Sequence, residues 1–153
     1  MKPIRNSAKA VIIRDGRLLA IELCDEQGPW FALPGGGQLA GETLHQALAR
    51  ECREEVNAAV RIGPLRFVRE YISAHHEFAH EDPDAHQVDF MFDCDLLNPE
   101  DVGPGTAPDV GQCGVRWLAL GDLSEHRLYP LELRAHLMDL DAGGPPVYLG
   151  DIN

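Results

Sequence analysis

The 153-residue sequence is 44% hydrophobic and 25% charged, with a formal net charge of -12. This length and composition are typical of a globular protein rather than a disordered or fibrous one, so we expect one domain over residues 1–153. The negative charge disfavours long nucleic acids and membranes as partners. A site that holds divalent cations would reverse the local sign and admit a small phosphorylated ligand.

The four cysteines are scattered and form no CxxC pair, which indicates reduced thiols rather than a disulfide framework. They are Cys24, Cys52, Cys94 and Cys113. The first residues, MKPIRNSAKAVII, lack the apolar region and cleavage site of a signal peptide, and no later run approaches the length of a membrane span. We therefore expect a cytoplasmic protein.

The first elements in chain order are two strands, Ala8 to Arg14 and Arg17 to Leu23. Asp15-Gly16 separates them, and this dipeptide tolerates the positive φ angles of a tight hairpin. A short apolar segment, Trp30 to Leu33, then runs into Pro34-Gly35-Gly36-Gly37, which predicts a loop.

The clearest helix is predicted over Leu44 to Val56. Thr43 and Gln46 form a capping-box pattern at its start, and the segment contains neither Gly nor Pro. Asn57 is a plausible left-handed stop, because Asn accepts that conformation better than most residues other than Gly.

Beyond this helix, two strands are expected over Leu65 to Ser73 and Gln87 to Leu96. The second alternates apolar with polar residues, which predicts one solvent-exposed face. Ala74 to His86 and Asn98 to Gly114 read as exposed loops.

Val115 to Leu120 returns to strand composition. A last helix is expected from Pro130, a good first helical residue, to near Leu140, stopped by Gly143-Gly144-Pro145-Pro146.

The helix over Leu44 to Val56 carries acidic residues where a simple amphipathic pattern has none. Leu48, Cys52 and Val56 define its inward face, and Glu51 and Glu55 fall within the same arc, with Glu54 at its edge. Their spacing of i, i+3 and i+4 places like charges side by side on the helix. They also lie near its C-terminal end, where the negative end of the helix dipole disfavours anions.

A divalent cation would offset this repulsion, and Mg²⁺ fits best because it takes oxygen ligands and shares its shell with phosphates. Surface charges tied to Arg50 and Arg53 are the alternative reading. The triple glycine allows close backbone approach, and its carbonyls could complete a metal shell, although such a run is often only a turn.

Together the two segments resemble the Nudix hydrolase family, whose signature is the Nudix box, here Gly36 to Ala58. The matching positions are Gly36, Glu42, Arg50, Glu51, Cys52, Glu54 and Glu55, with both gaps of the signature kept. Asn57 stands where the signature has Gly, and Ala58 where it has a larger apolar residue. Neither departure removes a ligand.

The resemblance implies an α+β protein with the Nudix fold, a three-layer α/β/α sandwich with a mixed β-sheet. It also implies that Glu51, Glu54 and Glu55 bind Mg²⁺, or Mn²⁺ as a substitute, together with the Gly36 carbonyl. Arg50 would orient the carboxylates, and Glu42 would join through hydrogen bonds or water. The general base varies in the family, so we take Glu54 as the first choice and two loop residues, Glu77 and Glu81, as alternatives.

Other signals have two readings each. The loop histidines could bind zinc or simply be solvated; they are His75, His76, His80 and His86. Some aromatic residues could stack on a nucleobase or belong to the core; they are Trp30, Phe31, Tyr71 and Phe78, of which Phe78 is the best candidate for ligand contact. Some arginines could hold phosphate or keep a face soluble; they are Arg5, Arg66 and Arg69.

Three functions are compatible with these residues. The first is hydrolysis of the diphosphate linkage of a nucleoside diphosphate joined to another group. The second is a non-catalytic nucleotide sensor, which would be expected to lose box carboxylates. The third is an enzyme similar to prenyl-diphosphate isomerases, for which we place no cysteine and glutamate pair. Members of the family that act on ADP-ribose carry a marker proline beyond the box; here Ser73 and Ala74 occupy that neighbourhood, so the marker is absent.

The family resemblance also makes a homodimer an expectation.

Overall fold

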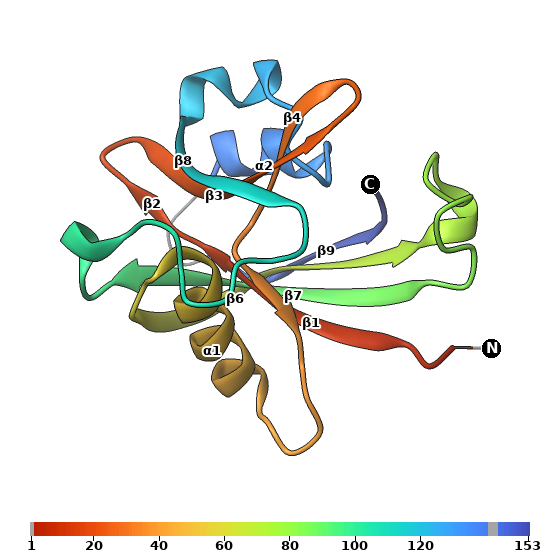
Figure 1. Cartoon of the computed structure of the whole chain (residues 1–153), viewed down its shortest axis with the longest axis horizontal. Coiled ribbons are helices and arrows are strands. Elements are labelled where there is room, and N and C mark those ends of the chain that lie inside the picture. Colours follow the sequence, from red (N-terminus) through yellow and green to blue (C-terminus); the bar gives the residue numbers. More distant parts are fainter. Residues whose placement is uncertain (1, 141–143) are drawn as a thin grey trace.

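The computed structural model describes residues 2–140 and 144–153, whose strands form two β-sheets (Figure 1). The first sheet has the spatial order β5 (Gly35–Gly37), β1 (Arg5–Val11), β7 (His86–Leu96), β6 (Val60–Ile72) and β9 (Val147–Asp151). The second contains β2 (Ile13–Arg14), β3 (Arg17–Asp25) and β4 (Gly28–Ala32), with β8 (Gln112–Ala119) paired to β3. Parallel pairs β1–β7 and β6–β9 lie beside antiparallel β6–β7, so the first sheet is mixed, as predicted.

Two α-helices cover opposite faces of the first sheet (Figure 1). Helix α1 (Leu44–Val56) packs in one core cluster with Phe92, and α2 (Leu133–Met138) packs in the other with Met91. Successive residues of a strand point to opposite faces, so the adjacent Met91 and Phe92 of β7 place the two helices on opposite sides. The result is the predicted three-layer α/β/α arrangement.

The described residues also form short 3₁₀ segments: η1 (Ser73–His75), η2 (Pro99–Asp101) and η3 (Leu120–Glu125). In the part of the chain that the structure describes, no helix has the length and apolar character needed to cross a membrane.

The first predicted strand is divided between the two sheets. The hairpin turn is as expected, with positive φ at Asp15 and Gly16, but only Ile13–Arg14 pairs with β3. Residues 5–11 form β1 instead, between β5 and β7. The prediction of one continuous strand over Ala8 to Arg14 was wrong because the chain changes sheet near Ile12, and both sheets bury the apolar side chains of this run.

The triple glycine is a strand rather than the predicted loop. Gly35–Gly37 pairs antiparallel with Ser7–Lys9 of β1. A Cβ at Gly35 would lie 2.1 Å from the Ala8 carbonyl oxygen, and its φ of 132° is one that L side chains rarely adopt. The absence of side chains therefore allows the backbone to lie closer to β1 than any other residue would permit.

The face of β7 that was predicted to be solvent-exposed is buried in the middle of the strand, whereas Asp95 near its end is exposed as predicted. Asp89 and Met91, which we assigned to that face, are each 1% exposed. β7 lies at the centre of the five-stranded sheet, with a layer on each side, which covers the middle of the strand. The polar residue there, Asp89, is ion-paired rather than solvated.

Other strands also differ from the predictions. β6 begins at Val60 rather than Leu65, because a register shift accommodates Gly63 and Pro64. β8 begins at Gln112 rather than Val115. β9 was not predicted at all.

The last helix is shorter than predicted. Residues Phe31 and Arg127 to Tyr129 exchange backbone hydrogen bonds, which hold the chain extended against β4 up to Pro130. Helix α2 therefore begins only at Leu133 and ends at Met138, not near Leu140. The predicted stop begins at Gly143, which lies outside the described residues.

The end of α1 is closed by the segment 103–107. The backbone N–H groups of Gly103, Gly105 and Ala107 donate to the carbonyl oxygens of the last three helical residues, Val56, Glu55 and Glu54, over 2.9–3.3 Å. These carbonyls have no partner within the helix, so the segment satisfies acceptors that every helix leaves open. A Cβ at Gly105 would lie 2.1 Å from the Glu54 carbonyl oxygen, whereas a Cβ at Gly103 would meet nothing within 4 Å.

We predict that Gly105→Ala destabilises the protein by about 1–3 kcal/mol, because the clash with backbone moves this segment off the helix and weakens its hydrogen bonds. Gly103→Ala is the matched control and should change the free energy of unfolding by less than about 0.5 kcal/mol. Urea unfolding of both variants measures the difference. Equal effects of the two substitutions would contradict this account of the helix end.

Candidate functional site

Helix α1 sets the direction of the predicted site residues. Its capping box is formed as predicted: Gln46 N–H donates to the Thr43 hydroxyl, and Thr43 N–H donates to the Gln46 amide. Asn57 ends the helix in the left-handed conformation, with φ 53°. With both ends fixed, Leu48 and Cys52 are fully buried and Glu55 turns inward beside them.

Glu55 is a buried carboxylate beneath the glycine strand. Its side chain is 1% exposed, and its Oε1 accepts a hydrogen bond of 2.6 Å from the Gly35 N–H. Burial raises the pKa of Glu55 to about 7, although the Lys9 ammonium and the Gly35 N–H oppose the shift. The Lys9 ammonium also donates to the Gly35 carbonyl oxygen at 3.0 Å, which ties β1, β5 and α1 together around this carboxylate.

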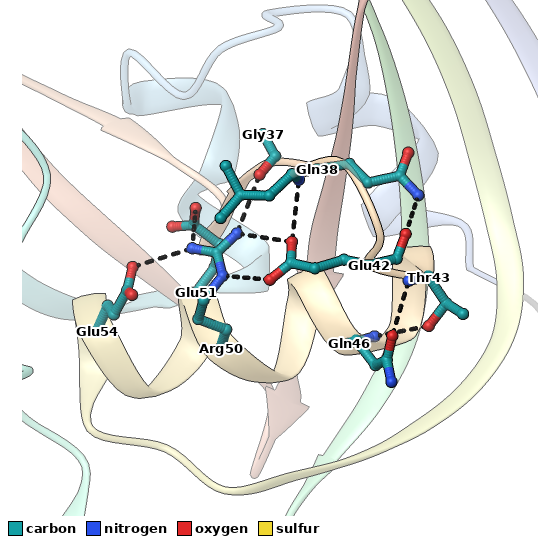
Figure 2. A network of polar contacts seen from close by, with 9 residues as sticks. Gly37, Gln38, Glu42, Thr43, Gln46, Arg50, Glu51 and Glu54 are labelled. Atoms are coloured by element: carbon teal, nitrogen blue, oxygen red, sulfur yellow. Dashed lines mark hydrogen bonds and ion pairs between the residues drawn. The ribbon is translucent and has the colours of Figure 1, made fainter.

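Arg50 connects the other predicted carboxylates (Figure 2). Its guanidinium binds both oxygens of Glu42, at 2.7 and 3.1 Å, and reaches Glu51 Oε1 at 3.0 Å and Glu54 Oε2 at 3.2 Å. A fifth contact, of 3.1 Å, goes to the Gly37 carbonyl oxygen. The structure therefore brings Glu42, Glu51 and Glu54 together around one cation.

Glu42 and Arg50 each stabilise the charged form of the other. The Arg50 guanidinium, with help from the Leu39 N–H, lowers the pKa of Glu42 to about 2. Glu42 in turn raises the pKa of Arg50 above its usual range, against the effect of burial. Bidentate Arg–carboxylate pairs are both short and directional, so Glu42 fixes the orientation of Arg50 toward the helix glutamates.

Gly36 lies directly against Glu51. A Cβ at Gly36 would lie 2.7 Å from the Glu51 Oε1, so a side chain there would displace this carboxylate from its place beside β5. The backbone of the glycine strand and the helix glutamates thus form one oxygen-rich face.

The donor atoms fit a hard cation such as Mg²⁺, since Glu51, Glu54, Glu55 and backbone carbonyls offer only oxygen. They are not gathered around a common point: within residues 2–140 and 144–153 no group of three His, Cys, Asp or Glu side chains is placed to hold a metal ion. Arg50 engages Glu51 and Glu54, and the Gly35 N–H engages Glu55. Binding a cation would therefore require these side chains to exchange partners.

Comparison with known proteins identifies the architecture. A family model described as the NUDIX domain matches residues 3–137. The chain belongs to the NUDIX family. No curated protein gives a significant match.

Solved structures agree with this assignment at the level of the fold. A NUDIX hydrolase from Nitrosomonas europaea has a TM-score of 0.73 and 23% identity, over 100% of this chain and 81% of its own. A MutT NUDIX hydrolase from Burkholderia pseudomallei has a TM-score of 0.69 and 24% identity, over 89% and 98%. The E. coli ORF135 protein has a TM-score of 0.70 and 20% identity, over 93% and 94%. The expected Nudix fold is therefore confirmed.

Beside the NUDIX carboxylates lies a cleft of about 1210 Å³. Glu42 and Lys9 lie at the junction between the cleft and the carboxylate cluster. Cationic side chains line it: Lys2, Arg5, Lys9 and Arg69. Aromatic side chains line it as well: Trp30, Tyr71, Phe78 and Tyr129. Cations and half-exposed rings are the groups that hold phosphates and stack on bases.

The structure divides the other sequence candidates between this cleft and the core. Phe31, 3% exposed, is a core residue, and Arg66 is buried 3.3 Å from Asp93. Glu81 lines the cleft. Glu77 is exposed and accepts a hydrogen bond from Asn153.

The predicted histidine loop is held to the C-terminal strand. His75 and His76 each lie 2.7 Å from the Asp151 carboxylate, and Asp151 also accepts from the Ile72 N–H. His86 contacts Glu70. Three of the four histidines thus have carboxylate partners, while His75 and His80 remain exposed, as the solvated reading expects. Phe78 and Glu81 of the same loop line the cleft.

Sequence reasoning missed Asp109. It lies in the loop before β8, lines the cleft and is close enough to Glu55 to raise the pKa of that carboxyl. Gln112 positions the turn, because its side chain donates to the Glu55 carbonyl oxygen at 2.9 Å and accepts from the Asp109 N–H. A loop rich in Pro and Gly carries no periodicity, so only its acidic residue before a strand could have drawn attention to it.

The floor of the cleft contains a buried ion pair. Asp89 is 1% exposed, and its carboxylate lies 2.6 Å from Arg69 across β6 and β7. Burial alone would raise the pKa of Asp89, but Arg69 and Lys9 outweigh it and lower the pKa. Arg61 and Asp95 form the same cross-strand pair at the other end of the two strands, with both side chains exposed.

We predict that Arg69→Met costs roughly 3–5 kcal/mol of stability near pH 7, because it leaves Asp89 charged and buried without its partner. The matched Arg61→Met should cost less than about 1 kcal/mol. The stabilisation by the buried pair is present above the ordinary carboxyl pKa of about 4 and is lost as the pH falls through the lowered folded value. Urea unfolding at pH 7 and at lower pH tests both points, and a penalty that does not depend on pH would contradict them.

Proposed function

We propose that the protein is a Mg²⁺-dependent pyrophosphohydrolase that cleaves the diphosphate linkage of a nucleoside diphosphate joined to another group, with Mn²⁺ as a substitute. One observation carries the proposal: the NUDIX carboxylates Glu42, Glu51 and Glu54, held by Arg50, and Glu55, held by the Gly35 N–H, adjoin a cleft lined by cations and aromatic rings. The carboxylates suit a metal, the cations suit phosphates, and the rings suit a base.

In this proposal Glu51, Glu54 and Glu55 bind the cation together with the Gly36 carbonyl. When bound, the cation would neutralise the diphosphate and activate a water for attack on phosphorus. Glu42 holds Arg50, and Arg50 orients Glu51 and Glu54. Of the residues that line the cleft, Lys9 and Arg69 would contact substrate phosphates, while Phe78 and Trp30 would contact the base or the second group.

The general base in this proposal is Glu54, which is the most exposed of the three helix glutamates, with a third of its side chain accessible. Exposure suits a group that takes a proton from water. Glu81 and the newly found Asp109 both line the cleft and are the main competitors, whereas Glu77 does not line it.

The first prediction concerns turnover. A panel of nucleotides that contain a diphosphate should be hydrolysed in Mg²⁺ and not in EDTA, and the double substitution Glu54→Gln, Glu55→Gln should lower kcat/KM at least 100-fold. Glu125→Gln, Glu132→Gln removes the same charge at two exposed positions and should retain activity. Phosphate and nucleotide release measure the outcome.

Tight binding of a nucleotide without turnover would instead identify a nucleotide sensor, and the hydrolase proposal would then be wrong. Activity that survives in the Glu54, Glu55 variant would place the metal elsewhere.

A second prediction separates the candidate bases. Glu54→Gln should lower kcat by about 10²–10⁴-fold and remove the acidic limb of the pH–rate profile, because it removes the group that accepts the proton. Glu77→Gln, Glu81→Gln and Asp109→Asn should each retain that limb. A large loss of kcat confined to Glu81→Gln or Asp109→Asn would transfer the role to that residue.

A cytoplasmic location, a homodimer and one domain over residues 1–153 stay predictions of the sequence. Size-exclusion chromatography with light scattering addresses the second.

A further inference from the structure

Two cysteines from distant parts of the sequence meet at the edge of the cleft. The sulfur atoms of Cys24 on β3 and Cys113 on β8 lie 2.8 Å apart, and both residues are exposed. Glu22 pairs with Gly114 and Leu23 with Gln112, so Cys113 is skipped in the register between the two strands. This irregularity leaves the Cys113 side chain free to approach Cys24.

The other two cysteines provide an internal contrast. Cys52 and Cys94 are buried, and burial raises the pKa of each thiol, to about 12 for Cys94. Buried thiols of raised pKa are poor nucleophiles and are shielded from solutes. Only the pair at the cleft combines exposure with a partner sulfur.

We propose that Cys24 and Cys113 form a thiol-oxidation site that closes to a disulfide when the protein meets hydrogen peroxide. A disulfide bond is about 2.05 Å long, so the sulfurs need to approach by only about 0.8 Å. The two sulfurs thus lie close to the separation of a disulfide bond.

The reaction balances in two steps. The Cys24 sulfur attacks peroxide, the O–O bond breaks, and a sulfenic acid forms with release of one water. The Cys113 sulfur then attacks the Cys24 sulfur, the S–O bond breaks, and the disulfide forms with release of a second water. In total, two thiols are oxidised and one peroxide is reduced. Cys24 lines the cleft, which is consistent with Cys24 as the sulfur that meets peroxide first, and the hydrogen bond to Cys24 raises the pKa of Cys113 to about 11.

Oxidation of this pair would fix the loop that carries Asp109. Cys113 follows Gln112, which bonds the Asp109 turn to the last turn of α1, and Cys24 lines the cleft. A disulfide would therefore anchor this turn to β3. It would also close a loop from residue 24 to residue 113, and closing a long loop restricts the unfolded chain.

The experiment uses the reduced full chain, treated with hydrogen peroxide and then mapped as peptides by mass spectrometry without reduction. We expect a peptide that joins Cys24 to Cys113, the loss of two titratable thiols per chain, and retention of Cys52 and Cys94 as thiols. The melting temperature should rise by roughly 5–10 °C and return after addition of a reductant.

The single variants Cys24→Ser and Cys113→Ser test the order of the steps. Cys113→Ser should accumulate a sulfenic acid at Cys24 that a dimedone label captures, whereas Cys24→Ser should react with peroxide at least 10-fold more slowly. Independent oxidation of the two thiols, disulfides only between chains, or an unchanged melting temperature would overturn the proposal. None of these readouts depends on hydrolase activity.

Discussion

Repulsion between like charges on one helix is the constraint around which this protein is organised. Glu51, Glu54 and Glu55 share less than two turns of α1, where they oppose one another and the helix dipole. The positive guanidinium of Arg50 offsets much of this repulsion. Its five N–H groups make five contacts: one each with Glu51, Glu54 and the Gly37 carbonyl, and two with Glu42. Glu55 is held separately, by the hydrogen bond from the Gly35 N–H, while burial favours its neutral form.

This arrangement of the glutamates depends on the glycine strand Gly35–Gly37, whose residues have no side chains. Gly35 donates to Glu55 because its backbone lies against β1, and Gly36 leaves space for the Glu51 carboxylate. The glycine strand is therefore the wall of the carboxylate cluster as well as an edge of the five-stranded sheet. A side chain at either position would displace an acidic group or the strand itself.

The sequence was informative wherever local physics decides the structure. The capping box at Thr43, the left-handed stop at Asn57 and the inward turn of Glu55 all follow from side chains within one helix, and each was found as predicted. The turn at Asp15-Gly16 was predicted for the same reason.

The predictions failed where contacts between residues remote in sequence determine the structure. The division of the first strand between two sheets, the burial of Asp89 and the late start of α2 depend on neighbours that are remote in sequence. The placement of Asp109 near Glu55 is a failure of the same kind, because no periodic pattern marks a loop whose position comes from hydrogen bonds to α1.

The segment 103–113 shows how such remote contacts complete the site. Its first part donates three backbone hydrogen bonds to the end of α1, and its last part reaches the same helix through Gln112. On its other side, Cys113 lies against Cys24 of β3. The segment is thus held between the helix that carries the NUDIX glutamates and a strand that borders the cleft. A movement of β8 relative to β3 would therefore displace Asp109 more than the side chains of the glutamates. Those side chains are held independently, by Arg50 and by the glycine strand.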